Sequence, residues 1–192
     1  RGCQQPVDNP QEYLVVARAM IDEGDGVTAL EHHGPCVDHC DPVALADAER
    51  HLFGVCLVND WSARDLQAWE YVPLGPFLGK SFATSISPWI VPMEALESAR
   101  THPPERDVPL LPYLDDDGSR PWALDLRLVV RLGDEVISRP PFAGLYWTAA
   151  QMLAHMTVNG ASVRPGDLFA SGTVSGDDRD QRGSLLELTW NG

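Results

Sequence analysis

Several polar side chains in this sequence have types and spacings suited to a binding or catalytic site. Asn59 and Asp60 end the apolar run of residues 53–60, so a strand would present the carboxylate of Asp60 at its end, where a hard cation can bind. The alternative is that Asp60 caps a helix that begins at Ser62. Lys80 follows Gly79 in a proline- and glycine-rich loop, where it can hold substrate charge or lie in solvent.

Further candidates lie on a predicted helix and near the end of the chain. Arg64, Gln67 and Tyr71 follow at spacings of three and four, which places them on one polar helical face. Thr173 lies in the glycine-bounded turn SGTVSG, whose N–H groups and hydroxyl can bind an anionic oxygen, although other strand turns look similar. Glu187 lies between leucines in LLELTW, which we interpret as a strand; its carboxylate needs a partner if that face is buried.

A second kind of site is suggested by a cluster of zinc-type ligands near the N-terminus. Structural zinc sites normally use two separated ligand pairs, and no second pair of the CxxC or HxxxH type follows this cluster. The missing second pair argues against a zinc-binding module, which is kept as a third reading. The cluster consists of His32, His33, Cys36, His39 and Cys40.

Composition narrows the class of protein. The chain has 192 residues, 44% of them hydrophobic, which is enough for one domain with one sizeable core. Its net charge of −14 argues against nucleic acid or an anionic membrane as a partner, because phosphates would be repelled. Neither a membrane-spanning run nor a secretory leader is recognisable, so a cytoplasmic location is expected, with the four cysteines as thiols. Arg1 is not an initiator residue, and we expect a fragment.

The elements that must position these residues are mostly short. Strands are scattered through the chain without an alternating strand–helix rhythm, which predicts an α+β, mainly β fold with antiparallel pairing. We expect helices at 42–51, 62–71 and 149–158, the last capped by Thr148, and read residues 12–23 as helix-like. We expect strands at 53–60, 83–92, 123–132 and 183–190, a hairpin from 123–132 into 135–139, and a surface excursion at 97–121.

Two long stretches resemble the fumarylacetoacetate hydrolase family. The first is HLFGVCLVNDWSARDLQAWEYVPLGPFLGKSFATSISPWIVPMEAL, and the second is YWTAAQMLAHMTVNGASVRPGDLFASGTVSG with GSLLELTW behind it. The resemblance implies a mixed β-sandwich roll and a homodimer. It also implies metal-dependent hydrolysis of a carbon–carbon bond of fumarylacetoacetate to fumarate and acetoacetate, in tyrosine and phenylalanine breakdown. The alternatives are another acylpyruvate-type hydrolase of this family and a non-catalytic truncated remnant.

The resemblance also implies roles for individual residues. Asp60 matches the carboxylate that binds calcium or magnesium, and Lys80 and Thr84 match a neighbouring magnesium site. Gln67, Tyr71 and Thr173 match substrate contacts, and Arg64 would suit the substrate's carboxylate as a permanently charged, bidentate donor. Glu187 matches the acid that orients a catalytic histidine, and that histidine is expected to lie outside this chain.

The sequence departs from the family upstream of Asp60. The family has a Glu-x-Glu pair of metal ligands there, whereas this chain offers Glu23 and Asp25 at the same alternate spacing. We interpret residues 11–41 as a stretch translated out of frame. Residues 1–192 are then expected to form a single, incomplete catalytic domain with a poorly matching segment at 1–41 and without the family's N-terminal domain.

Overall fold

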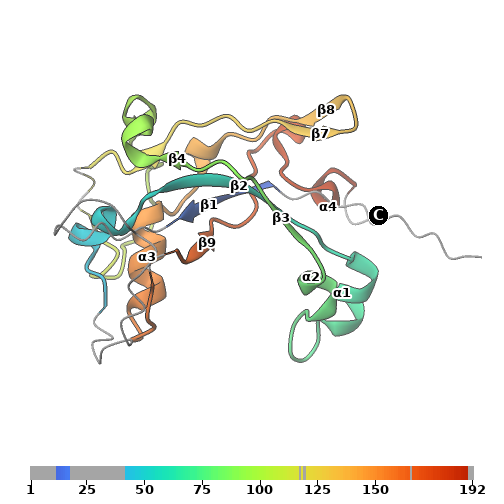
Figure 1. Cartoon of the computed structure of the whole chain (residues 1–192), viewed down its shortest axis with the longest axis horizontal. Helices are drawn as coiled ribbons and strands as arrows, with labels where there is room; N and C mark the ends of the chain where they lie inside the picture. The colour runs from blue at the N-terminus through green and yellow to red at the C-terminus, as the bar shows by residue number, and fades with distance from the viewer. Residues whose placement is uncertain (1–11, 18–41, 117, 119, 165, 190–192) are drawn as a thin grey trace, which may run out of the picture.

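A five-stranded antiparallel sheet lies at the centre of the computed structural model (Figure 1). The structure describes residues 12–17, 42–116, 118, 120–164 and 166–189. The strand order is β3-β2-β1-β9, and β4 pairs with the first half of β2. The strands are β1 (Glu12–Ala17), β2 (Gly54–Asp60), β3 (Thr84–Ile86), β4 (Val91–Pro92) and β9 (Leu168–Ala170).

β2 has the extent that its apolar run predicts. β1 contradicts the helix-like reading over residues 12–17, and the rest of that reading, residues 18–23, lies outside the described residues. β1 pairs with β2 over its whole length, from Glu12 opposite Asn59 to Ala17 opposite Gly54, and with β9 on its other side. Two hydrogen-bonded neighbours outweigh a weak local helix preference. The predicted strand at 83–92 is divided into β3 and β4, which pair with different parts of β2.

Two smaller sheets complete the β structure. β5 (Arg100–Thr101) pairs with β6 (Ala123–Leu124), so the segment at 97–121 is not only a surface excursion. β7 (Val130–Leu132) and β8 (Glu135–Ser138) form the predicted hairpin, with Gly133 at a positive φ in its turn. All strand pairs among the described residues are antiparallel, as expected.

The helices are short. α3 (Ala149–Thr157) begins with a capping box between Thr148 and Gln151, which confirms the predicted cap. The helix expected at 42–51 is the 3₁₀ helix η1 (Leu45–His51). The others are α1 (Arg64–Glu70), α2 (Leu78–Ser81), α4 (Leu185–Thr189), η2 (Met93–Ala99), η3 (Phe142–Gly144) and η4 (Arg179–Gln181).

The strand predicted at the end of the chain is wrong, because α4 occupies that segment. Ser184 precedes α4, and its hydroxyl accepts a hydrogen bond from the backbone N–H of Glu187 at 3.3 Å. Ser184 and Glu187 have the spacing of a capping box, a helix signal in the sequence that the apolar run LLELTW obscured.

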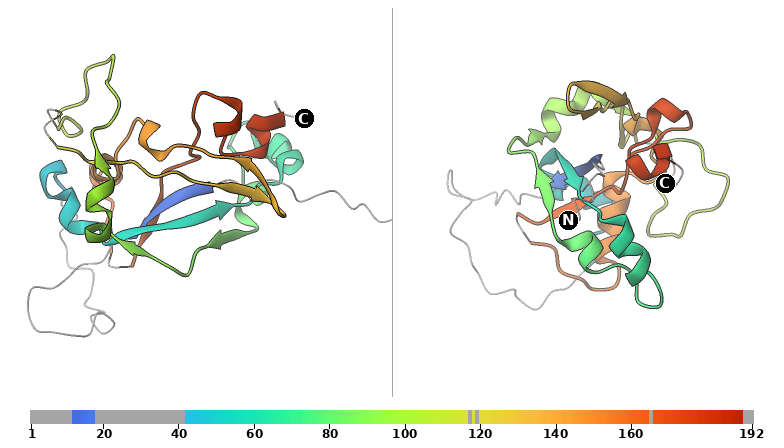
Figure 2. Two further views of the ribbon diagram at one scale, coloured as in Figure 1. Left: turned by 90° about the horizontal axis from the view of Figure 1, so that it is seen from above. Right: turned by 90° about the vertical axis from the view of Figure 1, so that its right-hand side faces the viewer.

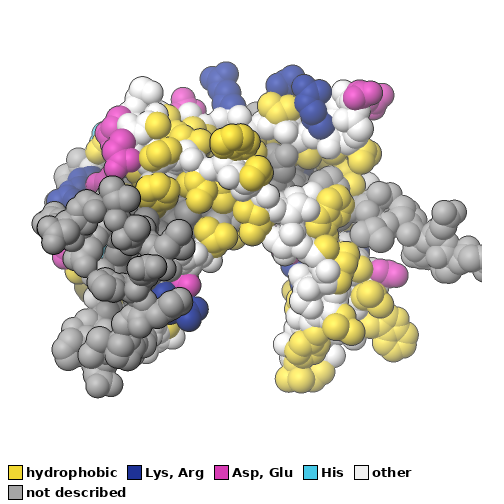
Figure 3. All heavy atoms as spheres, in the orientation of Figure 1, with side chains coloured by type: hydrophobic (Ala, Val, Ile, Leu, Met, Phe, Trp, Pro, Cys, Tyr) yellow, Lys and Arg dark blue, Asp and Glu magenta, His cyan; other side chains and the backbone are white. Residues whose placement is uncertain are grey.

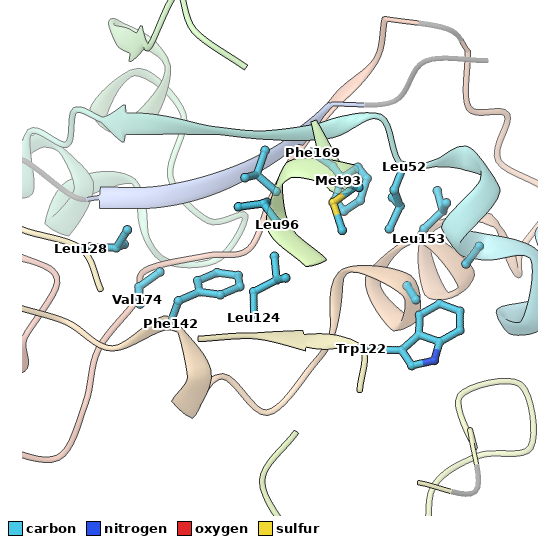
Figure 4. Close-up of a cluster of buried hydrophobic side chains, with 13 residues drawn as sticks. Leu52, Met93, Leu96, Trp122, Leu124, Leu128, Phe142, Leu153, Phe169 and Val174 are labelled. Carbon is cyan, nitrogen blue, oxygen red and sulfur yellow. The ribbon is translucent and has the colours of Figure 1, made fainter. Parts of the chain in front are cut away.

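The hydrophobic core lies between the central sheet, α3 and the segments around β6 and η3 (Figure 4). Leu153 of α3 and Val174 are fully buried there, and Leu124 of β6 is 2% exposed. Figure 2 shows α1, α2 and α4 at one end of the molecule and η1 at the other. Because the sheet runs between these ends, its strands carry residues from the core out to the α1–α2 region. None of the helices in the described ranges is long and apolar enough to cross a membrane.

Candidate functional site

Asp60 and Lys80 form an ion pair at the end of β2. Lys80 Nζ lies 2.7 Å from Asp60 Oδ2, and each side chain is about a quarter exposed, at 26% and 27%. The same ammonium donates to Ser62 Oγ at 2.9 Å. Neither simple alternative for these residues holds: α1 has Ala63 as its N-cap with no side-chain cap bond, and Lys80 does not extend into solvent.

The pairing depends on how the chain folds back between α1 and α2. The backbone N–H of Ala63 donates to the carbonyl of Gly79 at 2.8 Å. A Cβ at Gly79 would lie 2.8 Å from the backbone nitrogen of Gln67, so only glycine allows this approach without a shift. Lys80 therefore follows directly after the point where α2 contacts α1.

Glu70 was missed by the sequence reasoning, and it holds the start of α2. Its carboxylate accepts hydrogen bonds from the backbone N–H groups of Phe77 at 2.7 Å, Leu78 at 3.0 Å and Gly79 at 3.0 Å. The N–H groups of Gly79 and Phe77, followed by that of Leu78, hold the pKa of Glu70 below its usual range. The spacing of residue types in the sequence does not predict this contact, because its donors are backbone N–H groups whose positions depend on the turn between α1 and α2.

The polar face predicted for the helix is present on α1. Arg64 Nη1 donates to Gln67 Oε1 at 2.6 Å, and both side chains are partly buried. Tyr71 follows as the C-cap and is 62% exposed. The guanidinium, the amide and the phenol thus come from one short helix, whose N-terminus follows Asp60 closely.

Thr84 lies on the neighbouring strand. The register of β2 and β3 places Thr84 directly opposite Asp60, and Thr84 is exposed. Beside it, Trp61 Nε1 donates to Ser85 Oγ at 2.9 Å. The ends of these two strands are therefore connected by backbone pairing and by a side-chain hydrogen bond.

Glu187 is held by two serine hydroxyls. Ser175 Oγ donates to its Oε2 at 2.8 Å, and Ser184 Oγ donates to the same oxygen at 2.9 Å. Thr173, two residues before Ser175, is half-buried and close to Gly183, so it lies in the same loop region. α4, which carries Glu187, lies at the same end of the molecule as α1 and α2 (Figures 1 and 2).

The side chains around Asp60 show whether the described residues could complete a metal site. Within the described ranges, no group of three or more His, Cys, Asp or Glu side chains is placed to hold a metal. Ca²⁺ takes six to eight oxygen ligands, so Asp60 with nearby hydroxyls does not complete such a site. The candidates Glu23 and Asp25 and the zinc-type cluster at 32–40 lie outside the described residues.

Other outcomes for reactive and acidic residues are simpler. Cys56 is a free thiol, as expected for this cysteine. Its burial raises the pKa of the thiol. Glu12 is an acidic residue that the sequence reasoning did not consider. The strand register places it opposite Asn59, adjacent to the position of Asp60.

Known proteins resemble this chain over nearly its full length. The model of the family described as "Fumarylacetoacetate (FAA) hydrolase C-terminal" matches residues 35–189. Fumarylacetoacetase from Arabidopsis thaliana is 46% identical over 196 aligned residues, covering 100% of this chain and 46% of the relative. Fumarylacetoacetase from Rattus norvegicus is 51% identical over 165 residues, covering 83% of this chain and 39% of the relative. The chain thus spans less than half the length of these curated relatives.

A solved structure supports the fold. The crystal structure of fumarylpyruvate hydrolase from Pseudomonas aeruginosa in complex with Mn²⁺ and pyruvate matches with a TM-score of 0.54 and 21% identity. The match covers 86% of this chain and 53% of that one. With the family model matched over residues 35–189, the chain belongs to the fumarylacetoacetate hydrolase family, by its C-terminal domain.

Proposed function

We propose that this chain supplies the C-terminal part of an enzyme that hydrolyses fumarylacetoacetate to fumarate and acetoacetate, in the breakdown of tyrosine and phenylalanine. The observation that carries the proposal is 46% identity to a fumarylacetoacetase along the whole chain. The geometry at the end of β2 supports it, because Asp60, Lys80 and the polar face of α1 occupy one region.

Binding of the substrate is assigned to α1 and to the loop after β9. Arg64 would bind a carboxylate of the diketo acid, and its bond to Gln67 Oε1 would fix the orientation of the guanidinium. Tyr71 and Thr173 would supply hydroxyl contacts, which suits their exposed and half-buried positions. A planar, charged donor beside neutral donors matches a substrate that carries carboxylates and keto oxygens.

Glu187 is assigned to orient a histidine that activates water. Two serine hydroxyls on Oε2 would fix the carboxylate and direct Oε1 toward a partner. From the family resemblance we infer that this histidine lies outside these 192 residues. Turnover by the chain therefore requires the remainder of a longer protein or a substitute for its histidine.

We assign Asp60 to a bound Ca²⁺ or Mg²⁺ ion, with Lys80 and Thr84 beside it. The related fumarylpyruvate hydrolase structure contains Mn²⁺, a divalent ion with similar ligand preferences. A divalent ion held by Asp60 would supply electrostatic stabilisation of negative charge on a substrate oxygen. Because Asp60 alone supplies too few ligands, Glu23 and Asp25 are the acidic residues of this chain to test as additional ones.

Other readings use the same site. The solved fumarylpyruvate hydrolase favours a second acylpyruvate-type substrate as the alternative. A non-catalytic remnant would keep the fold without turnover. We also propose that the protein forms a homodimer and that it is located in the cytoplasm.

The test combines metal titration with an activity assay. The chain, and a full-length version completed with the N-terminal part of a related fumarylacetoacetase, are titrated calorimetrically with Mg²⁺ and Ca²⁺, and fumarylacetoacetate hydrolysis is measured on the same samples. In the full-length protein, Asp60→Ala is expected to abolish turnover and weaken ion binding, because a hard cation would lose a charged ligand. Glu94→Ala, an exposed change on η2, serves as the matched control. Unchanged turnover in Asp60→Ala would reject the assigned role.

A further inference from the structure

Lys80 is the single lysine among the 192 residues of this chain. Its ammonium is held by Asp60 Oδ2 and Ser62 Oγ at 2.7 and 2.9 Å. A lysine side chain has many rotamers, and its backbone must be fixed if the ammonium is to stay at Asp60. The question is which contact fixes the backbone at residue 80.

Hydrophobic packing does not fix it. α1 has no buried residue, and Gly79 is the buried residue of α2. The large apolar side chains in this unit point outward: Trp69 is 88% exposed, and Val72 and Leu74 are each 79% exposed. Figure 3 shows hydrophobic side chains gathered on the surface of the α1–α2 region. Polar contacts must therefore provide the order.

The carboxylate of Glu70 connects the end of α1 to the start of α2, the two ends of the turn. Glu70 is the last residue of α1, and its oxygens accept from three successive N–H groups, those of Phe77, Leu78 and Gly79. These donors lie at the start of α2, where helix N–H groups have no intrahelical acceptor. Hydrogen bonds from N–H groups to an ionised carboxylate are stronger than neutral ones. The last donor, Gly79, is the residue directly before Lys80.

We infer that Glu70 is a positioning residue of the site: through the N–H groups of residues 77–79, it holds Lys80 Nζ against Asp60. The contacts of Glu70 that carry this inference are with backbone N–H groups, so they act on Lys80 through the backbone of residues 77–79. The significance of this role for catalysis rests on the proposed function, but its effect on the Lys80 amine does not.

The single lysine makes the inference measurable without any activity assay. Acetylation by acetic anhydride requires an accessible, deprotonated amine, and peptide mass spectrometry then reports Lys80 without interference from another lysine. Glu70→Gln is expected to acetylate at Lys80 roughly tenfold faster than the unchanged chain, the factor that corresponds to one lost charge-assisted hydrogen bond. Asp60→Asn, which removes the ion pair directly, sets the upper limit of the rate.

Controls separate positioning from general unfolding. Glu94→Gln removes the charge of an exposed glutamate on η2 and should leave the rate unchanged. Circular dichroism and thermal unfolding confirm that each variant is folded, and Glu70→Asp, which keeps the charge on a shorter side chain, replaces Glu70→Gln if that variant does not fold. A folded Glu70→Gln or Glu70→Asp chain that acetylates at the original rate overturns the inference.

Kinetics of the completed enzyme give the catalytic part of the test. A fall in kcat/KM for Glu70→Gln, with the Glu94→Gln variant unaffected, is expected. If the unchanged enzyme has no hydrolase activity while Glu70→Gln still speeds acetylation, the proposed function fails and the positioning role stands. If the enzyme is active and Glu70→Gln matches it in both kcat/KM and acetylation rate, the positioning role fails alone.

Discussion

Gly79→Ala should loosen the α1–α2 unit for a steric reason that can be worked from the structure. The added Cβ would lie 2.8 Å from Gln67 N, 3.1 Å from Gln67 Cα and 3.1 Å from Ala63 O. All three are backbone atoms, so no side-chain rotation relieves the contact. Overpacking of this kind costs about 1–3 kcal/mol. Lower entropy of the unfolded chain offsets about 0.4–1 kcal/mol of that cost.

The expected net loss is therefore about 1–2 kcal/mol in the free energy that closes this unit. Gly144→Ala is the matched control, because its Cβ would meet nothing within 4 Å and its φ is not positive. That change gains the entropic term without the steric one. Because Gly144 lies in η3, outside the α1–α2 unit, this control shows what a glycine-to-alanine change without a steric contact does to the exchange of Gln67.

Native-state hydrogen exchange is the appropriate assay, since the unit can open without global unfolding. The amide of Gln67, which donates to Ala63 O at 2.9 Å, reports on the unit. Amides of α3 report on the core. We expect roughly tenfold faster exchange at Gln67 in Gly79→Ala, with α3 unchanged. Equal exchange at Gln67 in Gly79→Ala and Gly144→Ala would refute the steric argument.

Further predictions concern the ion pair, pH and the core. A double-mutant cycle with Asp60→Asn and Lys80→Met, followed by urea unfolding or hydrogen exchange, should give a coupling free energy of about 1–2 kcal/mol. This value lies between those typical of exposed and of buried ion pairs, and a coupling near zero would contradict the prediction. Because the pKa of Glu70 is lowered in the folded state, its stabilising effect is present above the ordinary glutamate value of about 4.3 and is lost as pH falls through the folded value. Exchange at Gln67 in Glu70→Gln should then differ from the unchanged chain at neutral pH and converge with it in acid; a constant difference would be inconsistent. Leu153→Ala, at a fully buried position, should cost about 2–5 kcal/mol in global unfolding, and a smaller loss would mean that the core refills the cavity.

Sequence patterns predicted the elements whose signal is local. β2 follows from a continuous apolar run, the hairpin of β7 and β8 from a turn glycine, and α3 from a capping side chain. β1 was misread because its strand form depends on pairing with β2 and β9, which no local preference encodes. α4 was misread because a short apolar run fits a strand or a helix equally well.

The same division applies to the site. The shared face of Arg64 and Gln67 follows from spacing within one helix, and the structure confirms it with a hydrogen bond. The pairing of Asp60 with Lys80 does not follow from spacing, because it depends on the turn between α1 and α2. Glu70 and Gly79 determine that turn through backbone contacts, and backbone contacts leave no pattern of residue types.

The α1–α2 unit can therefore lose its structure, and the site with it, while the rest of the domain stays folded. The buried hydrophobic cluster draws on residues from Ala48 to Val55 and from Met93 to Val174, and on none between them. Loss of the Glu70 contacts would open the unit while leaving that cluster intact, so a folded chain without a formed site is physically possible. Hydrogen exchange that shows a protected core and an unprotected Gln67 amide would favour the non-catalytic reading. Protection of both would mean that this chain retains the geometry on which the proposed hydrolysis depends.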